Sequence, residues 1–213
     1  GLANNHTNDY GVTGMRLTKK YLKAAGFAVA GTGESLREAR EPAYYDTPKG
    51  RVALISCSST FAVDIRAGNT FGNMPAHPGL NPLRHSTTFT VTPDEYSAME
   101  KLMGYVRTGE NEYLTDIKNE AEVMGVENFA KSYDNDVWFL GKRFVKGDVT
   151  AVHTEPHKTD IKEIAAMVKR ARRSADWVIV SVHSHEADGA DNSAPPEFLK
   201  TFSRAMIDAG ADV

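Results

Sequence analysis

The chain opens with GLANNHTNDYG, residues 1–11, and the fold is organised around this stretch. It places an amide (Asn5), an imidazole (His6) and a carboxylate (Asp9) directly behind an apolar segment that predicts a strand end. Binding and catalytic residues of α/β proteins commonly lie at strand ends. An Asn oxygen can bind a metal ion, an imidazole can give a proton to a leaving group, and a nearby carboxylate can fix the imidazole tautomer. From these residues alone, turn formation and helix capping are the stronger interpretation.

Behind this stretch, apolar spacing and turn residues predict a series of short elements. They are a helix at 12–25 ended by Gly26, a strand at 27–30, a short helix at 35–40, and strands at 42–46 and 51–57 joined by a turn at 47–50. The strand at 51–57 is apolar on both faces, so we expect it to be central in its sheet. This order predicts an α/β fold.

The regular pattern returns near the C-terminal end of the sequence. Residues 160–173 carry apolar side chains on one face and Lys and Arg on the other, which predicts a surface helix. The apolar run at 177–183 predicts a buried strand that ends in His183. A last helix is predicted to begin at Pro195-Pro196-Glu197 and to end at Ala209-Gly210.

Between these regions the pattern weakens. We interpret residues 58–157 as an insertion or lid that carries its own helices and hairpin. Thr92-Pro93-Asp94-Glu95 has the cap, the first-turn proline and the acidic third position of a helix that runs to about Arg107. A further helix is predicted at 114–124 and a hairpin at 136–145.

Composition sets limits on the function. A chain of 213 residues with 41% hydrophobic content predicts one sizeable core and a single domain, residues 1–213. A net charge of −3 and a pI near 6.2 give no reason to expect nucleic acid or an anionic membrane as the main partner. Cys57 lies within an apolar run, so we expect a buried thiol. No Gly-x-Ser-x-Gly sequence occurs, which disfavours a serine nucleophile.

Two sequence segments near the start resemble a known family. LANNHxxDYG (residues 2–11) is followed by AGFAVAGTG (residues 25–33), with Ala39, Arg40 and Pro42 close behind. Together they resemble the CapA family of poly-gamma-glutamate capsule synthesis proteins, which is similar to the calcineurin-like metallophosphoesterases. The resemblance implies a metallophosphoesterase-like fold, a two-sheet sandwich flanked by helices in α-β-β-α layers.

The same resemblance implies a metal site. VSVHxxE at residues 180–186 is similar to the strand-then-His element of the family. In this picture Asn5 and His183 bind one or two divalent ions (Mn, Fe or Zn), His6 acts as an acid or stabilises the leaving oxygen, and Asp9 orients His6. The remaining ligands of the family are expected before Gly1 and after Val213, so the chain is expected to be an internal fragment.

Four more residues are candidates for substrate binding. His185 and Glu186 follow the predicted ligand His183. They either support the metal ligands, face the substrate or are solvated loop residues. PGLNPLR (residues 78–84) is similar to a segment found in part of the family, and Arg84 beside His85 could clamp a phosphate or carboxylate. A role of Arg84 in tying down a long loop through backbone carbonyls is equally favoured.

Two functions follow from the resemblance. In the first, the protein is a metal-dependent hydrolase that acts on a phosphorylated or amide-linked polymer of the cell envelope. In the second, it is a non-catalytic accessory factor that binds the anionic polymer during capsule assembly or export. In either case the expected partners are an anionic polymer or phosphoester substrate and a membrane capsule-synthesis complex, and the expected location is the bacterial cell envelope.

Overall fold

The computed structural model describes residues 1–108, 130–133, 136–139, 142–189 and 193–213. The chain divides into two compact units. The first comprises Gly1–His85, Pro156–Ala187 and Asn192–Val213, and the second comprises Ser86–Glu155 with Asp188–Asp191. The main segment of the second unit therefore falls inside the stretch 58–157.

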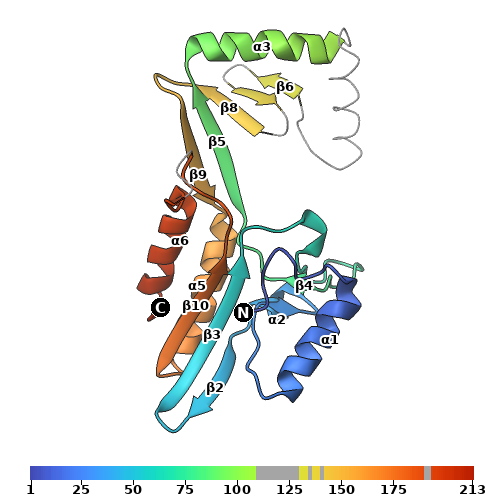
Figure 1. Cartoon of the computed structure of the whole chain (residues 1–213), viewed down its shortest axis with the longest axis vertical. Coiled ribbons are helices and arrows are strands. Elements are labelled where there is room, and N and C mark those ends of the chain that lie inside the picture. The colour runs from blue at the N-terminus through green and yellow to red at the C-terminus, as the bar shows by residue number, and fades with distance from the viewer. Residues whose placement is uncertain (109–129, 134–135, 140–141, 190–192) are drawn as a thin grey trace. The chain divides into compact units, whose positions relative to one another are not determined.

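The first unit is built around a three-stranded sheet (Figure 1). Its order is β10-β3-β2, with β3 parallel to β10 and antiparallel to β2. A small second sheet pairs β1 with β4. The elements of this unit are α1 (Gly11–Ala24), β1 (Thr32–Gly33), α2 (Leu36–Arg40), β2 (Ala43–Thr47), β3 (Gly50–Ser58), η1 (Val63–Ile65), β4 (Gly79–Leu80), α5 (Lys158–Arg172), β10 (Trp177–His183) and α6 (Glu197–Asp208).

The parallel register of β3 and β10 positions the candidate site. His183 is the partner of Ser58, so both strands reach their carboxyl ends at the same edge of the sheet. On its other side, β10 is bonded to the end of the chain, because the Val180 N–H donates to the Val213 carbonyl at 2.7 Å and the Asp212 N–H donates to the Val178 carbonyl at 2.8 Å.

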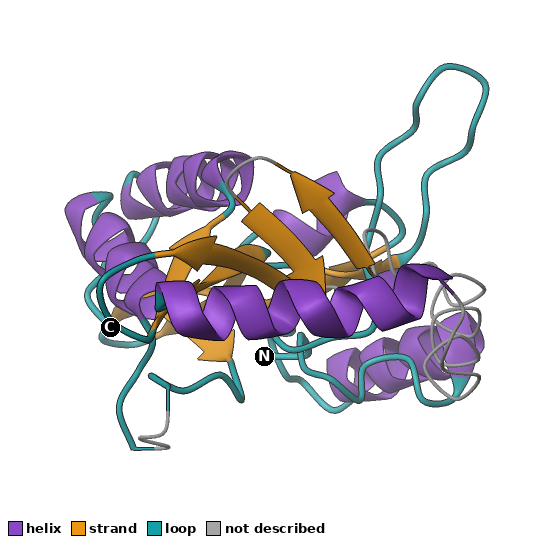
Figure 2. Cartoon of the chain, turned by 90° about the horizontal axis from the view of Figure 1, so that it is seen from above, coloured by secondary structure: helices purple, strands orange, loops and turns teal. Residues whose placement is uncertain are grey.

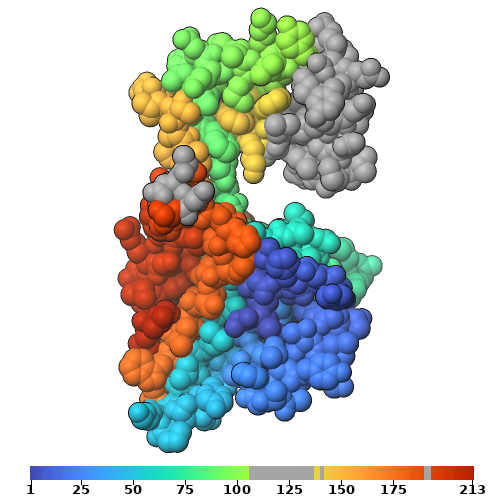
Figure 3. All heavy atoms as spheres, in the orientation of Figure 1, coloured from blue at the N-terminus to red at the C-terminus, as the bar shows by residue number. Residues whose placement is uncertain are grey.

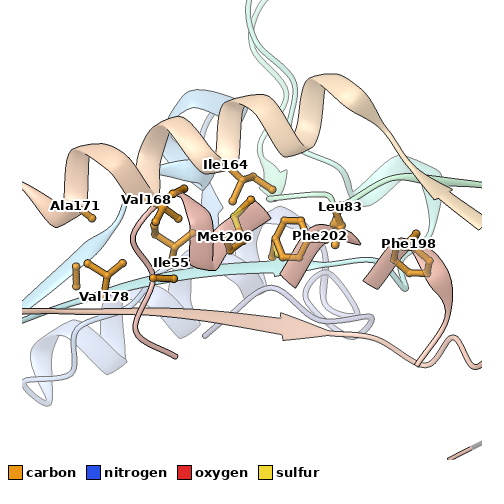
Figure 4. Packing of buried hydrophobic residues seen from close by; sticks show 13 residues of the cluster. Ile55, Leu83, Ile164, Val168, Ala171, Val178, Phe198, Phe202 and Met206 are labelled. Atoms are coloured by element: carbon orange, nitrogen blue, oxygen red, sulfur yellow. The ribbon is translucent and has the colours of Figure 1, made fainter. Parts of the chain in front are cut away.

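The main core lies between this sheet and the helices α5 and α6 (Figure 4). Alternate residues of β3 point into it, and α5 and α6 contribute apolar side chains at helical spacing. Its buried members include Ala53, Ile55, Cys57, Ile164, Val168, Ala171, Val178, Phe198, Phe202 and Met206. Burial raises the pKa of the Cys57 thiol to about 12, so this group stays a neutral thiol, as the sequence predicted.

The second unit is a five-stranded sheet with a helix packed on it. The strand order is β6-β7-β8-β5-β9, and Figure 2 shows α3 crossing over the strands at an angle. Tyr96 and Met103 of α3 pack against Val137 of β7 in a small core. The elements are β5 (His85–Val91), α3 (Pro93–Thr108), β6 (Ala130–Tyr133), β7 (Asp136–Phe139), β8 (Lys142–Lys146) and β9 (Ala151–Pro156).

The α/β fold predicted from the sequence is confirmed. The predicted helix that begins at Pro93 and the predicted central position of β3 are also confirmed, and Glu95 caps the helix by accepting from the Thr92 N–H at 2.8 Å. The strand predicted at 27–30 is wrong. This segment is tied to the start of the chain by the bond from the Leu2 N–H to the Ala30 carbonyl, and a ladder forms only at β1. The helix predicted at 114–124 lies outside the described residues.

Candidate functional site

The opening segment and the carboxyl end of β10 meet at one edge of the three-stranded sheet. Oδ1 of Asn5 lies 2.9 Å from Nε2 of His183, although 178 positions separate the two residues in the sequence. Figure 3 shows the dark-blue opening residues beside the orange end of β10 on the surface of the first unit. The structure therefore brings together the two residues predicted to bind metal.

A tight turn holds the opening segment in place. The side-chain oxygen of Asn4 accepts a hydrogen bond from the His6 N–H at 2.8 Å, and the Thr7 hydroxyl donates to the Leu2 carbonyl at 2.8 Å. Turn chemistry is thus present, as the residues alone indicated. Its effect is to present the neighbouring Asn5 half-buried and His6 exposed.

The imidazole of His6 is paired with a carboxylate. Nδ1 of His6 lies 2.9 Å from Oδ2 of Asp9. A carboxylate can only accept, so Nδ1 carries a proton and Nε2 of the neutral ring keeps a lone pair. The side chain of His6 is 73% exposed, so the ring is open to a large ligand. If Asp9 orients His6, the two side chains must be in contact, as they are here. The orienting role itself stays a prediction.

His183 is held in its neutral form. Burial and the neighbouring His185 ring lower the pKa of His183, with a smaller contribution from His6, and together these outweigh the opposing effect of Glu186. A neutral imidazole is the form that binds metal. The rings of His183 and His185 lie 4.7 Å apart between centroids and are tilted by 60°, so His185 is a direct neighbour of the predicted ligand.

Glu186 fastens the end of β10 to the end of β3. Its carboxylate accepts hydrogen bonds from the hydroxyls of Ser59 at 2.6 Å, Ser184 at 2.7 Å and Thr60 at 3.0 Å. Burial alone would raise the pKa of Glu186, but these bonds outweigh it and lower the pKa below its ordinary value. The Ser59 N–H also donates to the His183 carbonyl at 3.0 Å. The Glu186 side chain is therefore engaged in fixing the chain around His183.

We expect the Glu186→Ala variant to bind metal about 10- to 100-fold more weakly than the wild type, because residues that orient a ligand contribute on that scale. Glu186→Gln should stay close to wild type, since an amide can still bond to the three hydroxyls. Titration with Mn²⁺ measures both. Glu155→Ala removes an exposed carboxylate elsewhere and serves as the control. Equal losses in the Ala and Gln variants would mean that Glu186 acts through its charge.

Arg84 contacts Asp160, and His85 contacts Phe198. The main-chain N–H, Nε and Nη2 of Arg84 bond to Asp160 at 3.0, 2.8 and 2.8 Å, and Nη2 of Arg40 bonds to the same carboxylate at 2.5 Å. Arg84 thus ties down its loop, through a buried carboxylate rather than backbone carbonyls. The His85 ring stacks on Phe198 with centroids 4.2 Å apart. The roles predicted for Arg84 and His85 in substrate binding stay predictions.

The Asn5–His183 pair fits a divalent ion. Oδ1 of Asn5 and Nε2 of His183 are 2.9 Å apart and share a hydrogen bond. Two ligand atoms that bind one octahedral ion at about 2.1 Å lie about 3 Å apart, so the pair could take up an ion with little movement. Across the described ranges, no group of three or more His, Cys, Asp or Glu side chains is placed to hold an ion. The described residues therefore supply two of the donors that such a site would use.

Three further residues hold the predicted site residues in place and are not marked as functional by the sequence pattern. Ser59 and Thr60 hold Glu186, and Asp160 holds Arg84. A signal exists for the first two, because they come directly after the buried strand β3. No comparable signal marks Asp160, which lies in the first turn of α5.

Comparisons with known proteins show the family to which the chain belongs. The whole chain, residues 1–213, matches the sequence profile of the family described as "Bacterial capsule synthesis protein PGA_cap". The proteins y4sH and y4uA of Sinorhizobium fredii (strain NBRC 101917 / NGR234) are each 32% identical over 212 residues, an alignment that covers 100% of this chain and 42% of each relative. The chain thus spans less than half the length of these relatives. The resemblance to the CapA family is confirmed, and the chain belongs to the bacterial capsule synthesis proteins of the PGA_cap family.

Proposed function

We propose that the opening segment and the end of β10 form part of a metal-dependent hydrolase site of the metallophosphoesterase type. The observation that supports this most is the 2.9 Å contact between Asn5 and His183, with the His6–Asp9 pair directly beside it. In the first pair Nε2 of His183 donates to Oδ1 of Asn5, and both atoms would offer a lone pair to a cation once that hydrogen leaves. The second pair holds a proton on an oriented imidazole. Such a division of tasks suits the hydrolysis of a phosphoester or a similar electrophile.

Asn5 and His183 would hold the divalent ion, which we expect to be Mn, Fe or Zn. An amide oxygen and a neutral imidazole nitrogen are ordinary donors to these ions. The lowered pKa of His183 supports this role, because it keeps the ring unprotonated at neutral pH. When bound, the ion supplies Lewis-acid chemistry toward an oxygen of the substrate.

His6 would give a proton to the leaving oxygen. Asp9 accepts from Nδ1, so protonation at Nε2 produces an imidazolium that the carboxylate stabilises and orients. Because the His6 side chain is 73% exposed, its Nε2 can reach the backbone of a polymer as well as a small ester. His185, beside His183, is proposed to face the substrate, and Arg84 to bind an anionic part of it.

The substrate class that we propose is a phosphorylated or amide-linked polymer of the cell envelope. Membership of the capsule synthesis family supports this class and a location at the bacterial envelope. Partners would then include an anionic polymer and other components of a membrane capsule-synthesis complex. None of the helices in the described ranges has the length and apolar character to cross a bilayer.

Metal analysis before and after chelation tests this proposal. We expect stoichiometric Mn, Fe or Zn in the purified full chain, and hydrolysis of a generic aryl phosphodiester that chelation abolishes and added Mn²⁺ restores. Metal-free protein without turnover would overturn the proposal. The remaining function would then be the accessory one, in which the fold binds the anionic polymer without chemistry, and polymer-binding assays would follow.

A further inference from the structure

A cavity of about 420 Å³ opens in the first unit, separate from the Asn5–His183 pair. Its lining includes Val63, Arg66, His77, Pro82 and Arg84. This volume lies in the range of cavities that hold small molecules. We call it the Arg66–Arg84 cavity after its two guanidinium groups.

Arg84 presents a guanidinium whose orientation is fixed. Nε and Nη2 both bond to Asp160 at 2.8 Å, and Asp160 is fully buried, so the plane of the group cannot turn freely. The side chain is nonetheless 35% exposed. Among the described residues, Nη1 of Arg84 has no hydrogen-bond acceptor. A guanidinium that is already oriented and still has unused N–H donors loses little conformational entropy when it binds an anion.

Arg66 supplies a second guanidinium to the same cavity. Its Nε donates to the Val63 carbonyl at 3.0 Å. Within the described part of the chain, its terminal nitrogens meet no acceptor and no carboxylate. The base of the Arg66 side chain is fixed as well, because its carbonyl accepts from Nδ1 of His77 at 2.9 Å. The Arg66 group therefore also offers donors to the cavity.

Two guanidinium groups and one carboxylate line the cavity. The carboxylate in its lining is Asp64, which is exposed, and Asp160 behind it is already shared by Arg84 and the buried Arg40. Val63, 72% exposed, adds an apolar wall. Oriented guanidinium donors next to a small apolar surface match a ligand that carries an anionic group on a short aliphatic body.

We propose that the Arg66–Arg84 cavity binds the carboxylate or phosphate group of a small anionic ligand. Arg84 and Arg66 would each donate to the anion, and Val63 would contact its aliphatic part. The proposal places in this cavity the anionic group that Arg84 is proposed above to bind, and in that respect it rests on the proposed function. It does not depend on the metal chemistry, because neither Asn5 nor His183 lines the cavity.

The test uses two probes, glutarate and inorganic phosphate, each added to the metal-free full chain. Calorimetry measures the affinity, and NMR spectra follow the ring signals of the seven histidines. We expect saturable binding of one or both probes, with the signals of His77 shifting. The tighter probe identifies whether the anionic group is a carboxylate or a phosphate. Arg66→Ala should weaken this binding at least tenfold, the usual scale for a charge-assisted hydrogen bond.

Two further variants make the test specific. Arg173→Ala removes an exposed positive charge at the end of α5 and should leave the affinity unchanged. Arg66→Lys keeps the charge but loses the paired N–H donors of the guanidinium. Its affinity for the probe should lie between those of Arg66→Ala and the wild type. The proposal is overturned if neither probe binds saturably at millimolar concentrations, or if Arg66→Ala and Arg173→Ala bind equally well. Such a result would leave the metal assays of the proposed hydrolase unaffected.

Discussion

Replacing His183 with Ala should remove tight metal binding from the full chain while leaving its fold intact. His183 is one of the two donors in the 2.9 Å contact with Asn5, and its position at the end of β10 is only partly buried. Losing a direct ligand costs more than losing a residue that orients one, so we expect affinity to fall by at least about 100-fold. Metal content by mass spectrometry and Mn²⁺ titration measure the loss, and circular dichroism checks the fold.

The matched control is His153→Ala, which removes an exposed histidine from β9 in the second unit. Its metal content should equal that of the wild type. Asn5→Ala should give an intermediate loss, because an amide oxygen is a weaker donor than an imidazole nitrogen. If His183→Ala retained its metal, the assignment of the metal site would be wrong, whatever the result with phosphodiester substrates.

The sequence predicts the parts of this site better than their assembly. The apolar run that ends in His183 predicts β10 to the residue, because strand length and strand end are both local properties. That Asn5 lies against His183 cannot follow from local pattern, since 178 positions separate them. The prediction that Asn5 and His183 share a site comes only from the resemblance to a known family.

The incorrect strand at 27–30 has a physical explanation. Phe27 to Ala30 has suitable residues, but a strand needs a partner along its length. This segment has one bond to Leu2, and the Phe27 N–H donates back to the Leu22 carbonyl of α1. β1 and β4, which do pair, are only two residues each and leave little trace in the sequence. Pairing between short segments is a property of the whole fold.

Arg84 illustrates the same limit for side chains. The sequence places it in a proline-stiffened loop and leaves open whether it binds substrate or ties down that loop. Its partner Asp160 lies 76 positions away, in a helix whose first turn predicts only favourable capping charge. In the structure this carboxylate is fully buried between Arg84 and Arg40, which makes it a structural centre of the first unit.

We therefore expect Asp160→Asn to lower the free energy of unfolding by about 3–5 kcal/mol, the usual cost of removing one partner from a buried ion pair. The Arg40 side chain is only 4% exposed and would keep a buried charge with weaker compensation, mainly from the half-exposed Glu163. Urea unfolding followed by circular dichroism measures the change. Asp46→Asn, at an exposed ion pair with Arg51, is the control and should leave the midpoint unchanged. Equal midpoints for the two variants would contradict a structural role for Asp160.

The pH dependence of the unfolding free energy distinguishes the contribution of the Asp160 charge from that of its packing. Burial alone would raise the pKa of this carboxyl, but the hydrogen bonds from Arg84 and the nearby Arg40 charge outweigh burial and lower the pKa below its ordinary value of 3.8. A carboxyl with a lowered pKa in the folded state contributes stability above its unfolded pKa and loses it as pH falls toward the folded pKa. The difference in unfolding free energy between the wild type and Asp160→Asn should thus be constant from neutral pH down to about pH 5 and shrink below pH 4. Acidification removes the charge of Asp160 from the wild type and leaves the Asp160→Asn variant unchanged at this position. A difference in unfolding free energy that stayed constant below pH 4 as well would therefore mean that Asp160 acts through packing and not through its charge.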